Sequence, residues 1–369
     1  MAQTNLFPEI TEGDARGRTT ARHAEAPIYG ASYRLEQIAI HFQKAEELYR
    51  TWPTPICIVA DGPYGLSGFP GDLPTANSLI EWYRPHIAAW SERSTPETTL
   101  WFWNSELGWA TVHPLLVELG WEYRCCHVWD KGAGHIAGNA NSITLRKFPV
   151  ITEVCVQYVK APRFLANRRE MPMQEWLRFE WERTGLPFRL ANEACGVLNA
   201  ASRKYLTADH LWYFPPPEAF EQMTRYANKQ GDPRGRPYFS VNGKRPISAE
   251  EWTVFRAKFN CTVGITNVWR HPQVSGNERI GGIRQRMKWK YKSLHGSQKP
   301  LKLIEIPIAA STEPGDVVWE PFGGLCPSAI CSYQLRRRCF SAEIVPEFYL
   351  AAIERLSAYA PKTQSAKQK

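Results

Sequence analysis

Residues 317–343 combine a glycine turn with a later acid in a pattern that suits a nucleoside cofactor. Val317 to Glu320 is short, β-branched and bounded by turn signals, which predicts a buried strand. Phe322-Gly323-Gly324 follows, and Ser328 to Arg336 has an apolar pattern compatible with a helix. A strand, a glycine turn and a helix place free backbone amides beside a ligand. Glu343 ends the next expected strand, about twenty residues past the turn, where an acid can accept hydrogen bonds from a ribose.

A second motif, Asp61-Gly62-Pro63-Tyr64-Gly65, follows the apolar stretch Ile56 to Ala60. That stretch has the continuous apolar character of a strand in a parallel sheet. Open α/β sheets bind their ligands at the carboxyl ends of such strands. The motif offers one carboxylate acceptor, one backbone carbonyl held rigid by proline, and one aromatic ring. Taken alone, the same residues are typical of an ordinary turn.

The string from His295 to Glu343 resembles the carboxy-terminal part of the β-class DNA amino-methyltransferases. That family methylates adenine N6 or cytosine N4 with S-adenosylmethionine. The matching residues are His295, Gln298-Lys299-Pro300, Pro314-Gly315-Asp316, Pro321-Phe322, Gly324 and Glu343. The chain departs from the family pattern in three places: Glu320 replaces aspartate, Leu325-Cys326 replaces Ser-Gly, and Pro327 replaces threonine.

The earlier motif resembles the family's Asp-Pro-Pro-Tyr, with Gly62 in place of the first proline. Trp129-Asp130-Lys131 resembles the family's Trp-x-Lys, and residues 148–160, which include Glu153, resemble the hairpin strand that follows it.

The resemblance implies a role for each matching residue. Asp61 accepts a hydrogen of the target amino group, the Gly62 carbonyl before Pro63 supplies a second acceptor, and Tyr64 stacks on the extruded base. The implied cofactor residues are Lys299, Pro300, Glu320, Pro321, Phe322, Gly323, Gly324 and Glu343. The reaction needs neither a metal nor a covalent cysteine. Aspartate at the first motif position is more usual in the adenine enzymes, which favours adenine N6 over cytosine N4.

Strands alternate with helices around these motifs. Helical spacing predicts helices over 33–49, 79–90 and 112–119, and apolar runs predict strands over 98–103 and 121–129. This alternation is typical of a doubly wound α/β sheet. The resemblance implies a seven-stranded, Rossmann-like methyltransferase sheet, circularly permuted, with an inserted target-recognition domain.

The net charge of +9 is concentrated in one part of the chain. Residues 201–300 hold 18 Lys and Arg against 7 Asp and Glu, a local balance of +11, which favours a polyanion partner. Helical patterns over 173–183 and 191–203 suggest a helix-turn-helix-like element. The residues expected to contact double-stranded DNA are Arg203, Lys204, Arg234, Arg236, Arg284, Arg286 and Lys288.

These observations divide the chain into five parts. We expect a flexible arm over 1–26, the catalytic half over 27–162, the DNA-binding insertion over 163–290, the cofactor half over 291–360, and a tail over 361–369. The sequence contains no run of 18 uninterrupted apolar residues, so no membrane span is expected. The N-terminus lacks an export pattern and nine cysteines lack CxxC spacing, so a cytoplasmic location with reduced thiols is expected.

Several alternatives stay open at this point. The target could be cytosine N4, or the protein could keep the fold and bind DNA without methylating it. RNA or a protein glutamine could be the substrate of the same chemistry. The chain could also be a DNA-binding module with an unrelated α/β domain. A cognate restriction endonuclease and a homodimeric assembly are left open as partners.

Overall fold

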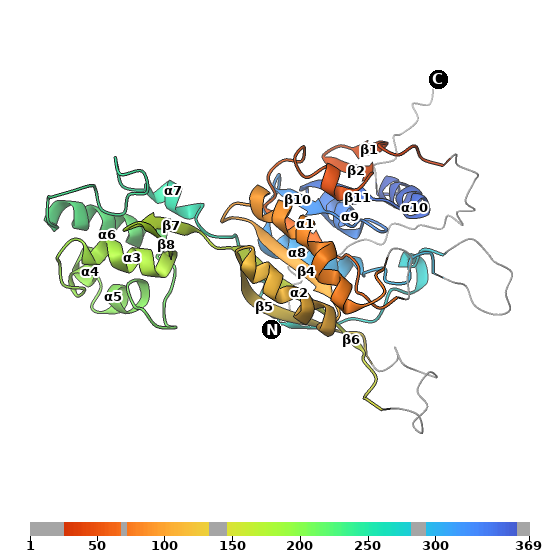
Figure 1. Ribbon diagram of the computed structural model, residues 1–369, viewed down its shortest axis with the longest axis horizontal. Helices are drawn as coiled ribbons and strands as arrows, with labels where there is room; N and C mark the ends of the chain where they lie inside the picture. The colour runs from red at the N-terminus through yellow and green to blue at the C-terminus, as the bar shows by residue number, and fades with distance from the viewer. Residues whose placement is uncertain (1–25, 68–71, 133–145, 282–292, 360–369) are drawn as a thin grey trace, which may run out of the picture.

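The computed structural model describes residues 26–67, 72–132, 146–281 and 293–359. Within these ranges the chain forms a body built on one large sheet and a separate helical body (Figure 1). The predicted tail over 361–369, and the predicted arm over 1–26 apart from its last residue, lie outside the described residues.

The large sheet has nine strands in the order β1-β2-β11-β10-β3-β4-β6-β5-β9. All strands run parallel except β1 and β6, which are antiparallel to their neighbours. Their bounds are β1 (Ser32–Leu35), β2 (Ile38–Phe42), β3 (Cys57–Ala60), β4 (Thr99–Asn104), β5 (Trp121–Asp130), β6 (Thr152–Lys160), β9 (Val268–Arg270), β10 (Val317–Glu320) and β11 (Arg338–Glu343). The two edge strands, β1 and β9, bring the count above the expected seven.

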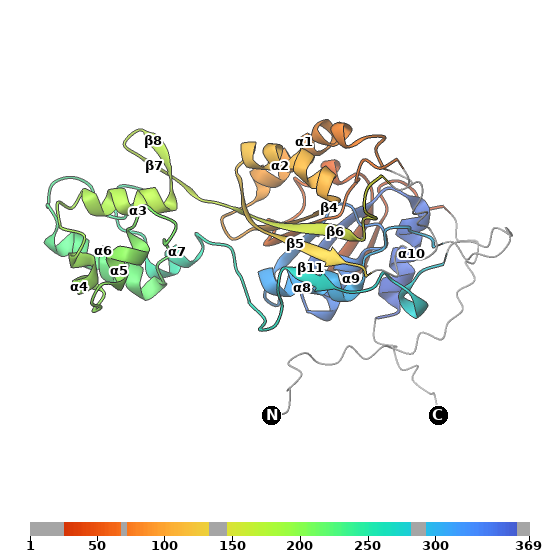
Figure 2. The same cartoon turned by 90° about the horizontal axis from the view of Figure 1, so that it is seen from below.

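Helices cover both faces of this sheet, which confirms the doubly wound α/β class (Figure 2). One face packs against α1 (Leu79–Arg93) and α2 (Glu106–Glu118). The other face packs against α8 (Leu301–Ser311), α9 (Pro327–Gln334) and α10 (Pro346–Ser357).

The central strands β3 and β10 bury alternate residues in the two cores. Cys57 and Val59 face the α8–α10 side, whereas Ile58 and Ala60 face the α1–α2 side. Because side chains alternate along a strand, both faces of β3 must be apolar, and its sequence is continuously apolar. β3 pairs directly with β10 through Val318 and Cys57. The two predicted motifs therefore emerge at the carboxyl ends of neighbouring strands in the middle of the sheet.

The helical body has its own apolar core, formed by residues between Phe164 and Phe255. It begins with the hairpin β7 (Arg163–Ala166) and β8 (Arg169–Pro172) and continues through α3 (Met173–Glu182), α4 (Leu190–Ala194), α5 (Ala200–Tyr205), α6 (Pro217–Gln230) and α7 (Ala249–Thr253). Two connections join it to the sheet body, one after β6 and one before β9 (Figures 1 and 2). β9 pairs with β5, so the chain has returned to the sheet by Val268.

The helix predicted over 33–49 is wrong. Residues 32–42 form the hairpin β1–β2, which turns at Glu36 with a left-handed φ of 50°. β2 then inserts beside β11, where both of its faces are largely buried. A strand buried on both faces has apolar residues at nearly every position, so some of them also match helical spacing.

The single helix predicted over 191–203 is interrupted. α4 ends at Ala194 and α5 begins at Ala200, with Gly196 between them at a φ of 63°. The buried side chain of Asn192 binds the backbone amide of Ser202 at 2.9 Å, which closes the two short helices on each other.

Candidate active site

Asp61 to Tyr64 leave the carboxyl end of β3 at the centre of the sheet. The carbonyl of Pro63 accepts hydrogen bonds from the Tyr83 hydroxyl at 3.2 Å and the Asn104 amide at 3.1 Å. Tyr83 belongs to α1 and Asn104 ends β4, so neighbouring elements fix the path of the motif.

Gly62 is required by close packing between the two motifs. A Cβ atom at this position would lie 2.5 Å from the Tyr83 hydroxyl and 2.8 Å from Cδ2 of Phe322. Phe322 follows β10, the strand of the other predicted motif. The replacement of the family's first proline by glycine therefore lets Phe322 approach the backbone beside Asp61.

Asp72 holds the residues after the motif in a tight turn. Its carboxylate accepts the backbone N–H groups of Tyr64 at 2.8 Å, Gly65 at 2.7 Å and Leu66 at 2.9 Å. Hydrogen bonds from amides to an ionised carboxylate are stronger than neutral ones. Sequence reasoning missed Asp72, because no spacing rule distinguishes it from any other aspartate in a glycine-rich loop.

Lys299, which was expected to bind the cofactor, forms an ion pair with Asp61. Its ammonium nitrogen is 2.9 Å from each carboxylate oxygen of Asp61, and its side chain is fully buried. Although burial alone lowers the pKa of Lys299, the carboxylates of Asp61 and Glu153 raise it above its ordinary value. Lys299 is therefore a permanent cation beside the first motif.

A network of buried side chains continues from this pair. The Tyr64 hydroxyl lies 2.9 Å from Oδ1 of Asp61 and 3.0 Å from Oε2 of Glu153. Glu153 also pairs with Lys131, whose ammonium nitrogen is 2.6 Å from Oε1. Both residues lie in stretches that resemble the family, but sequence reasoning assigned neither of them a role.

A cavity of about 330 Å³ joins the two motifs. Its lining contains the whole of Asp61 to Tyr64, Lys299, the turn Pro321 to Gly324, and Glu343. Pro300 and Glu320, which were predicted to bind the cofactor, do not line this cavity. A larger cavity of about 800 Å³, between residues 259–271 and α8, contains none of the predicted site residues.

The Glu320 side chain forms its hydrogen bonds within the protein core. Its buried carboxylate accepts the backbone amides of Ser328 at 2.6 Å and Ala329 at 3.2 Å, at the start of α9, and the hydroxyl of Ser341 at 2.8 Å. Burial raises its pKa to about 7, against the lowering effect of these donors. The first amides of α9 were expected to face a ligand, but the carboxylate of Glu320 accepts hydrogen bonds from two of them. The N-terminus of a helix favours a negative charge at this position.

Glu343 is at the cavity, as expected. Oε1 accepts the amides of Ile344 at 2.9 Å and Val345 at 2.7 Å, and Oε2 accepts that of Gly324 at 2.6 Å. Burial raises the pKa of Glu343 to about 7, although these amides favour the ionised form. A carboxylate has about four acceptor positions. Among the contacts of the described residues, one position on Oε2 is left for a ligand hydroxyl.

The altered turn leaves the cavity open. Cys326 adopts a left-handed backbone with a φ of 49°, and its sulfur lies 3.3 Å from the Ser341 hydroxyl in the core. Leu325 and Pro327 line the cavity, but Cys326 does not. The side chain that replaces the family's second glycine therefore points away from the cavity.

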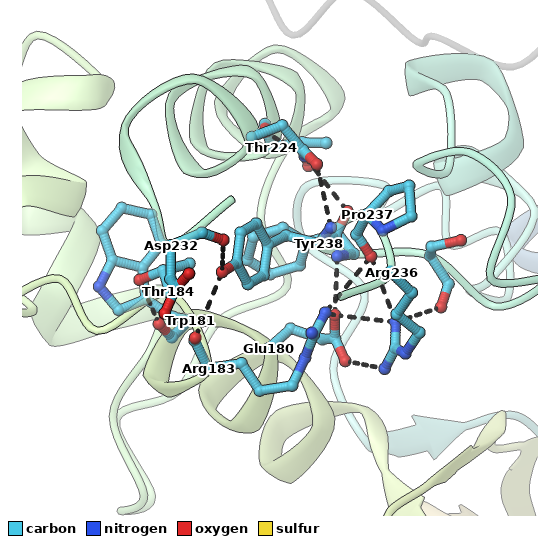
Figure 3. Close-up of polar contacts among 12 residues, drawn as sticks. Glu180, Trp181, Arg183, Thr184, Thr224, Asp232, Arg236, Pro237 and Tyr238 are labelled. Atoms are coloured by element: carbon cyan, nitrogen blue, oxygen red, sulfur yellow. Dashed lines mark hydrogen bonds and ion pairs between the residues drawn. The ribbon is translucent and has the colours of Figure 1, made fainter. Parts of the chain in front are cut away.

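The predicted DNA-contacting residues separate into three groups. Arg203 and Lys204 are exposed on α5, and Arg234 is 88 % exposed while pairing with Asp232. Arg236 instead holds the core of the helical body together, since its guanidinium pairs with the fully buried Glu180 and donates to the Ser240 carbonyl at 2.8 Å (Figure 3). Its predicted role in DNA contact conflicts with these contacts. Arg284, Arg286 and Lys288 lie outside the described residues.

Two kinds of feature are absent from the described part of the chain. No group of three or more His, Cys, Asp or Glu side chains there could hold a metal ion. None of the helices in those ranges is long and apolar enough to cross a membrane.

Comparison with known proteins gives a family match and several structural matches. A family model described as DNA methylase matches residues 56–354. The M1.HpyAVI–SAM complex is 15 % identical, with a TM-score of 0.43 over 86 % of this chain and 99 % of that chain. TTHA0409 from Thermus thermophilus, complexed with S-adenosyl-L-methionine, is 15 % identical, with a TM-score of 0.44 over 86 % and 92 %. The cytosine-N4-specific PvuII DNA methyltransferase is 13 % identical, with a TM-score of 0.49 over 89 % and 94 %.

Proposed function

The chain belongs to the family of N6 and N4 DNA methylases, and from that membership we propose that it methylates N6 of an adenine extruded from duplex DNA. At the level of the family it is an S-adenosylmethionine-dependent DNA methyltransferase that acts on an exocyclic amino group. The choice of adenine, the extrusion of the base and the role of each residue are our proposals. The observation that supports the roles of the residues is one cavity that joins Asp61 to the glycine turn and Glu343, and the choice of adenine rests on the resemblance.

The cavity fits the cofactor by its chemistry. Phe322 and Trp82, whose ring centroids are 5.0 Å apart, give it an aromatic wall suited to an adenine ring. Glu343 offers its remaining acceptor position to a ribose hydroxyl, and Gly323 and Gly324 bring backbone close to the ligand. When bound there, S-adenosylmethionine supplies a methyl group on a sulfonium sulfur.

The first motif acts on the target nitrogen. Its lone pair is delocalised into the base, so the amino group must become more tetrahedral before it can attack a methyl group. Asp61 accepts one amino hydrogen and the Gly62 carbonyl accepts another, which favours that geometry. Tyr64 supplies the stacking surface, because it lines the same cavity as Asp61, while Lys299 lies over its ring at 5.2 Å.

Adenine is favoured by the aspartate at position 61, through the resemblance to the adenine enzymes. Cytosine N4 is the second candidate, because the same three groups suit either exocyclic amine. Adenine and cytosine present the same kind of donor to Asp61, so only identification of the methylated base distinguishes the two candidates.

The helical body is proposed as the target-recognition part, within the insertion 163–290. Arg203, Lys204 and Arg234 carry exposed positive charge there, which suits phosphate contacts. Arg284, Arg286 and Lys288 remain predicted contacts. A partner endonuclease and a homodimer remain proposals from the resemblance alone.

The test is sequencing with modification detection, on DNA from cells expressing the wild type or Asp61→Ala. We expect a methylated motif with the wild type only, which would identify the base and the recognition sequence together. N4-methylcytosine would transfer the proposal to cytosine. Unmodified DNA in both samples would favour a protein that binds DNA without methylating it.

A further inference from the structure

The ion pair between Lys131 and Glu153 is buried next to the side chains of Tyr64 and Lys299, and it does not line the cavity. Lys131 follows β5 and Glu153 is the second residue of β6, so adjacent antiparallel strands bring them together. Their side chains are 9 % and 13 % exposed, and neither residue lines the cavity around Asp61. Burying two charges has a large desolvation cost, so such a pair contributes little net stability by itself.

The two oxygens of Glu153 have different partners. Oε1 faces Lys131 at 2.6 Å. Oε2 lies 3.0 Å from the Tyr64 hydroxyl and 3.3 Å from the ammonium nitrogen of Lys299. Lys131 therefore fixes one end of a carboxylate whose other end contacts both neighbours of Asp61.

These contacts determine what Asp61 has left to offer. Among the described residues, Oδ1 receives the Tyr64 hydroxyl and Lys299, each at 2.9 Å, whereas Oδ2 receives only Lys299, also at 2.9 Å. A carboxylate oxygen accepts about two hydrogen bonds. Oδ1 is therefore saturated, and Oδ2 keeps one position for a new donor.

Tyr64 and Lys299 are each shared between Asp61 and Glu153. The Tyr64 phenol has one proton and lies within reach of Oδ1 of Asp61 and Oε2 of Glu153, so the two carboxylates hold its hydroxyl between them. Lys299 has three N–H groups, and its neighbours are Asp61, Glu153 and the Ser297 carbonyl at 3.2 Å. Removal of the Glu153 charge would free both side chains to move.

We propose that Glu153 and Lys131 are positioning residues of the methyl transfer, which hold Lys299 and Tyr64 so that Oδ2 of Asp61 alone faces the target amino group. The inference rests on the proposed function and assigns the pair no contact with substrate. Glu153 does not serve as the proton acceptor. Burial alone raises its pKa, but Lys299 and Lys131 together bring that pKa below its ordinary value, so the carboxylate stays ionised.

The variants are Glu153→Gln, Lys131→Met and the double variant. Glutamine can still accept from Tyr64 or Lys299, but its amide N–H₂ then opposes the ammonium of Lys131. Lys131→Met removes that opposed donor, so the double variant should recover activity relative to Glu153→Gln. Glu118→Gln, in the exposed pair with Arg84 at 3.2 Å, is the matched control for loss of one charge.

The assay is transfer of labelled methyl groups into unmethylated genomic DNA, with thermal unfolding measured alongside. For Glu153→Gln we expect kcat to fall about a hundredfold, as a misplaced catalytic group allows, while the KM for S-adenosylmethionine changes less than about twofold. The double variant should recover about tenfold, and Glu118→Gln should match the wild type. A Glu153→Gln variant with unchanged kcat, or a loss seen only in KM and unfolding temperature, would overturn the positioning role.

Failure of the proposed function has a different signature. If the wild type transfers no methyl group, that function is wrong, and a crystal structure of Glu153→Gln still decides the positioning claim. Displaced Tyr64 and Lys299 side chains would support it, and side chains in unchanged positions would refute it.

Discussion

Lys299 donates to both carboxylate oxygens of Asp61 at 2.9 Å, across 238 residues of sequence. Lys299 lies just before α8 and Asp61 directly follows β3, so this contact joins the two parts of the chain that were expected to form the cofactor half and the catalytic half. The ammonium is fully buried and Asp61 is 20 % exposed. The carboxylate that faces the cavity is therefore paired with a fully buried cation.

Replacement of Lys299 by methionine should destabilise the fold. Asp61 and Glu153 would remain as neighbouring carboxylates without their shared cation, and breaking a buried pair in this way costs about 3–5 kcal/mol. The raised pKa of Lys299 means that its stabilising contribution is present below about pH 10.4 and is lost only at more alkaline pH. Urea unfolding at neutral pH measures the loss, and Lys299→Met/Glu153→Gln should recover part of it. A single variant as stable as the wild type would contradict the contact.

The sequence was sufficient for the parts of this site that depend on local pattern. β3 and β10 lie within a residue of their expected limits and β11 ends at Glu343 as expected, because short apolar runs bounded by turn residues have few alternatives. The two motifs then meet in one cavity, since β3 and β10 are neighbours. The resemblance supplied that pairing, which the pattern of residues alone could not give.

The parts that sequence could not supply depend on long-range side-chain contacts. Glu320 was expected at the ligand, but it binds the first amides of α9, and only three-dimensional geometry shows which way a carboxylate turns. Arg236 was counted as exposed positive charge, yet Glu180, 56 residues earlier, takes its guanidinium into the core of the helical body. A count of basic residues cannot separate these two uses of arginine.

Binding of S-adenosylmethionine should strengthen as pH rises through about 7. Burial raises the pKa of Glu343 to about 7, and a ribose hydroxyl binds better to the ionised carboxylate. If only that form binds, affinity should rise about tenfold between pH 6 and pH 8. Burial lowers the pKa of His295, which moves the titration of this neighbour away from pH 7 toward the acid side.

Calorimetric titration of the cofactor against pH tests this dependence. Glu343→Gln should remove it while retaining any titration of the cofactor itself. Glu320→Gln is the matched control, because burial also raises the pKa of Glu320 to about 7, but this carboxylate does not line the cavity. A pH dependence that survives in Glu343→Gln and disappears in Glu320→Gln would assign the effect to the wrong carboxylate.

Replacement of Gly62 by alanine should weaken cofactor binding and stability together. The new methyl group would lie 2.5 Å from the Tyr83 hydroxyl and 2.8 Å from Phe322, so one of these rings must move. Overpacking of this kind costs about 1–3 kcal/mol, and Phe322 is part of the proposed cofactor wall. Thermal unfolding and cofactor titration measure the two effects. Gly281→Ala, where no atom of the described residues lies within 4 Å of the added carbon, should leave both unchanged.

Loss of two arginines from the helical body should have opposite consequences. Arg203 is exposed on α5, so Arg203→Gln should leave stability unchanged and reduce the salt dependence of DNA binding by about 0.9 in log–log slope for one lost phosphate contact. Arg236→Gln should instead leave Glu180 short of a partner inside the core and lower the unfolding temperature of that body.

Fluorescence anisotropy of duplex DNA over a salt series, together with thermal unfolding, separates the two arginines. The salt slope of Arg236→Gln should equal that of the wild type at temperatures where the helical body is folded. A reduced slope in Arg236→Gln at full stability would return this arginine to the DNA interface. An unchanged slope in Arg203→Gln would move the DNA path off α5, toward the predicted contacts Arg284, Arg286 and Lys288.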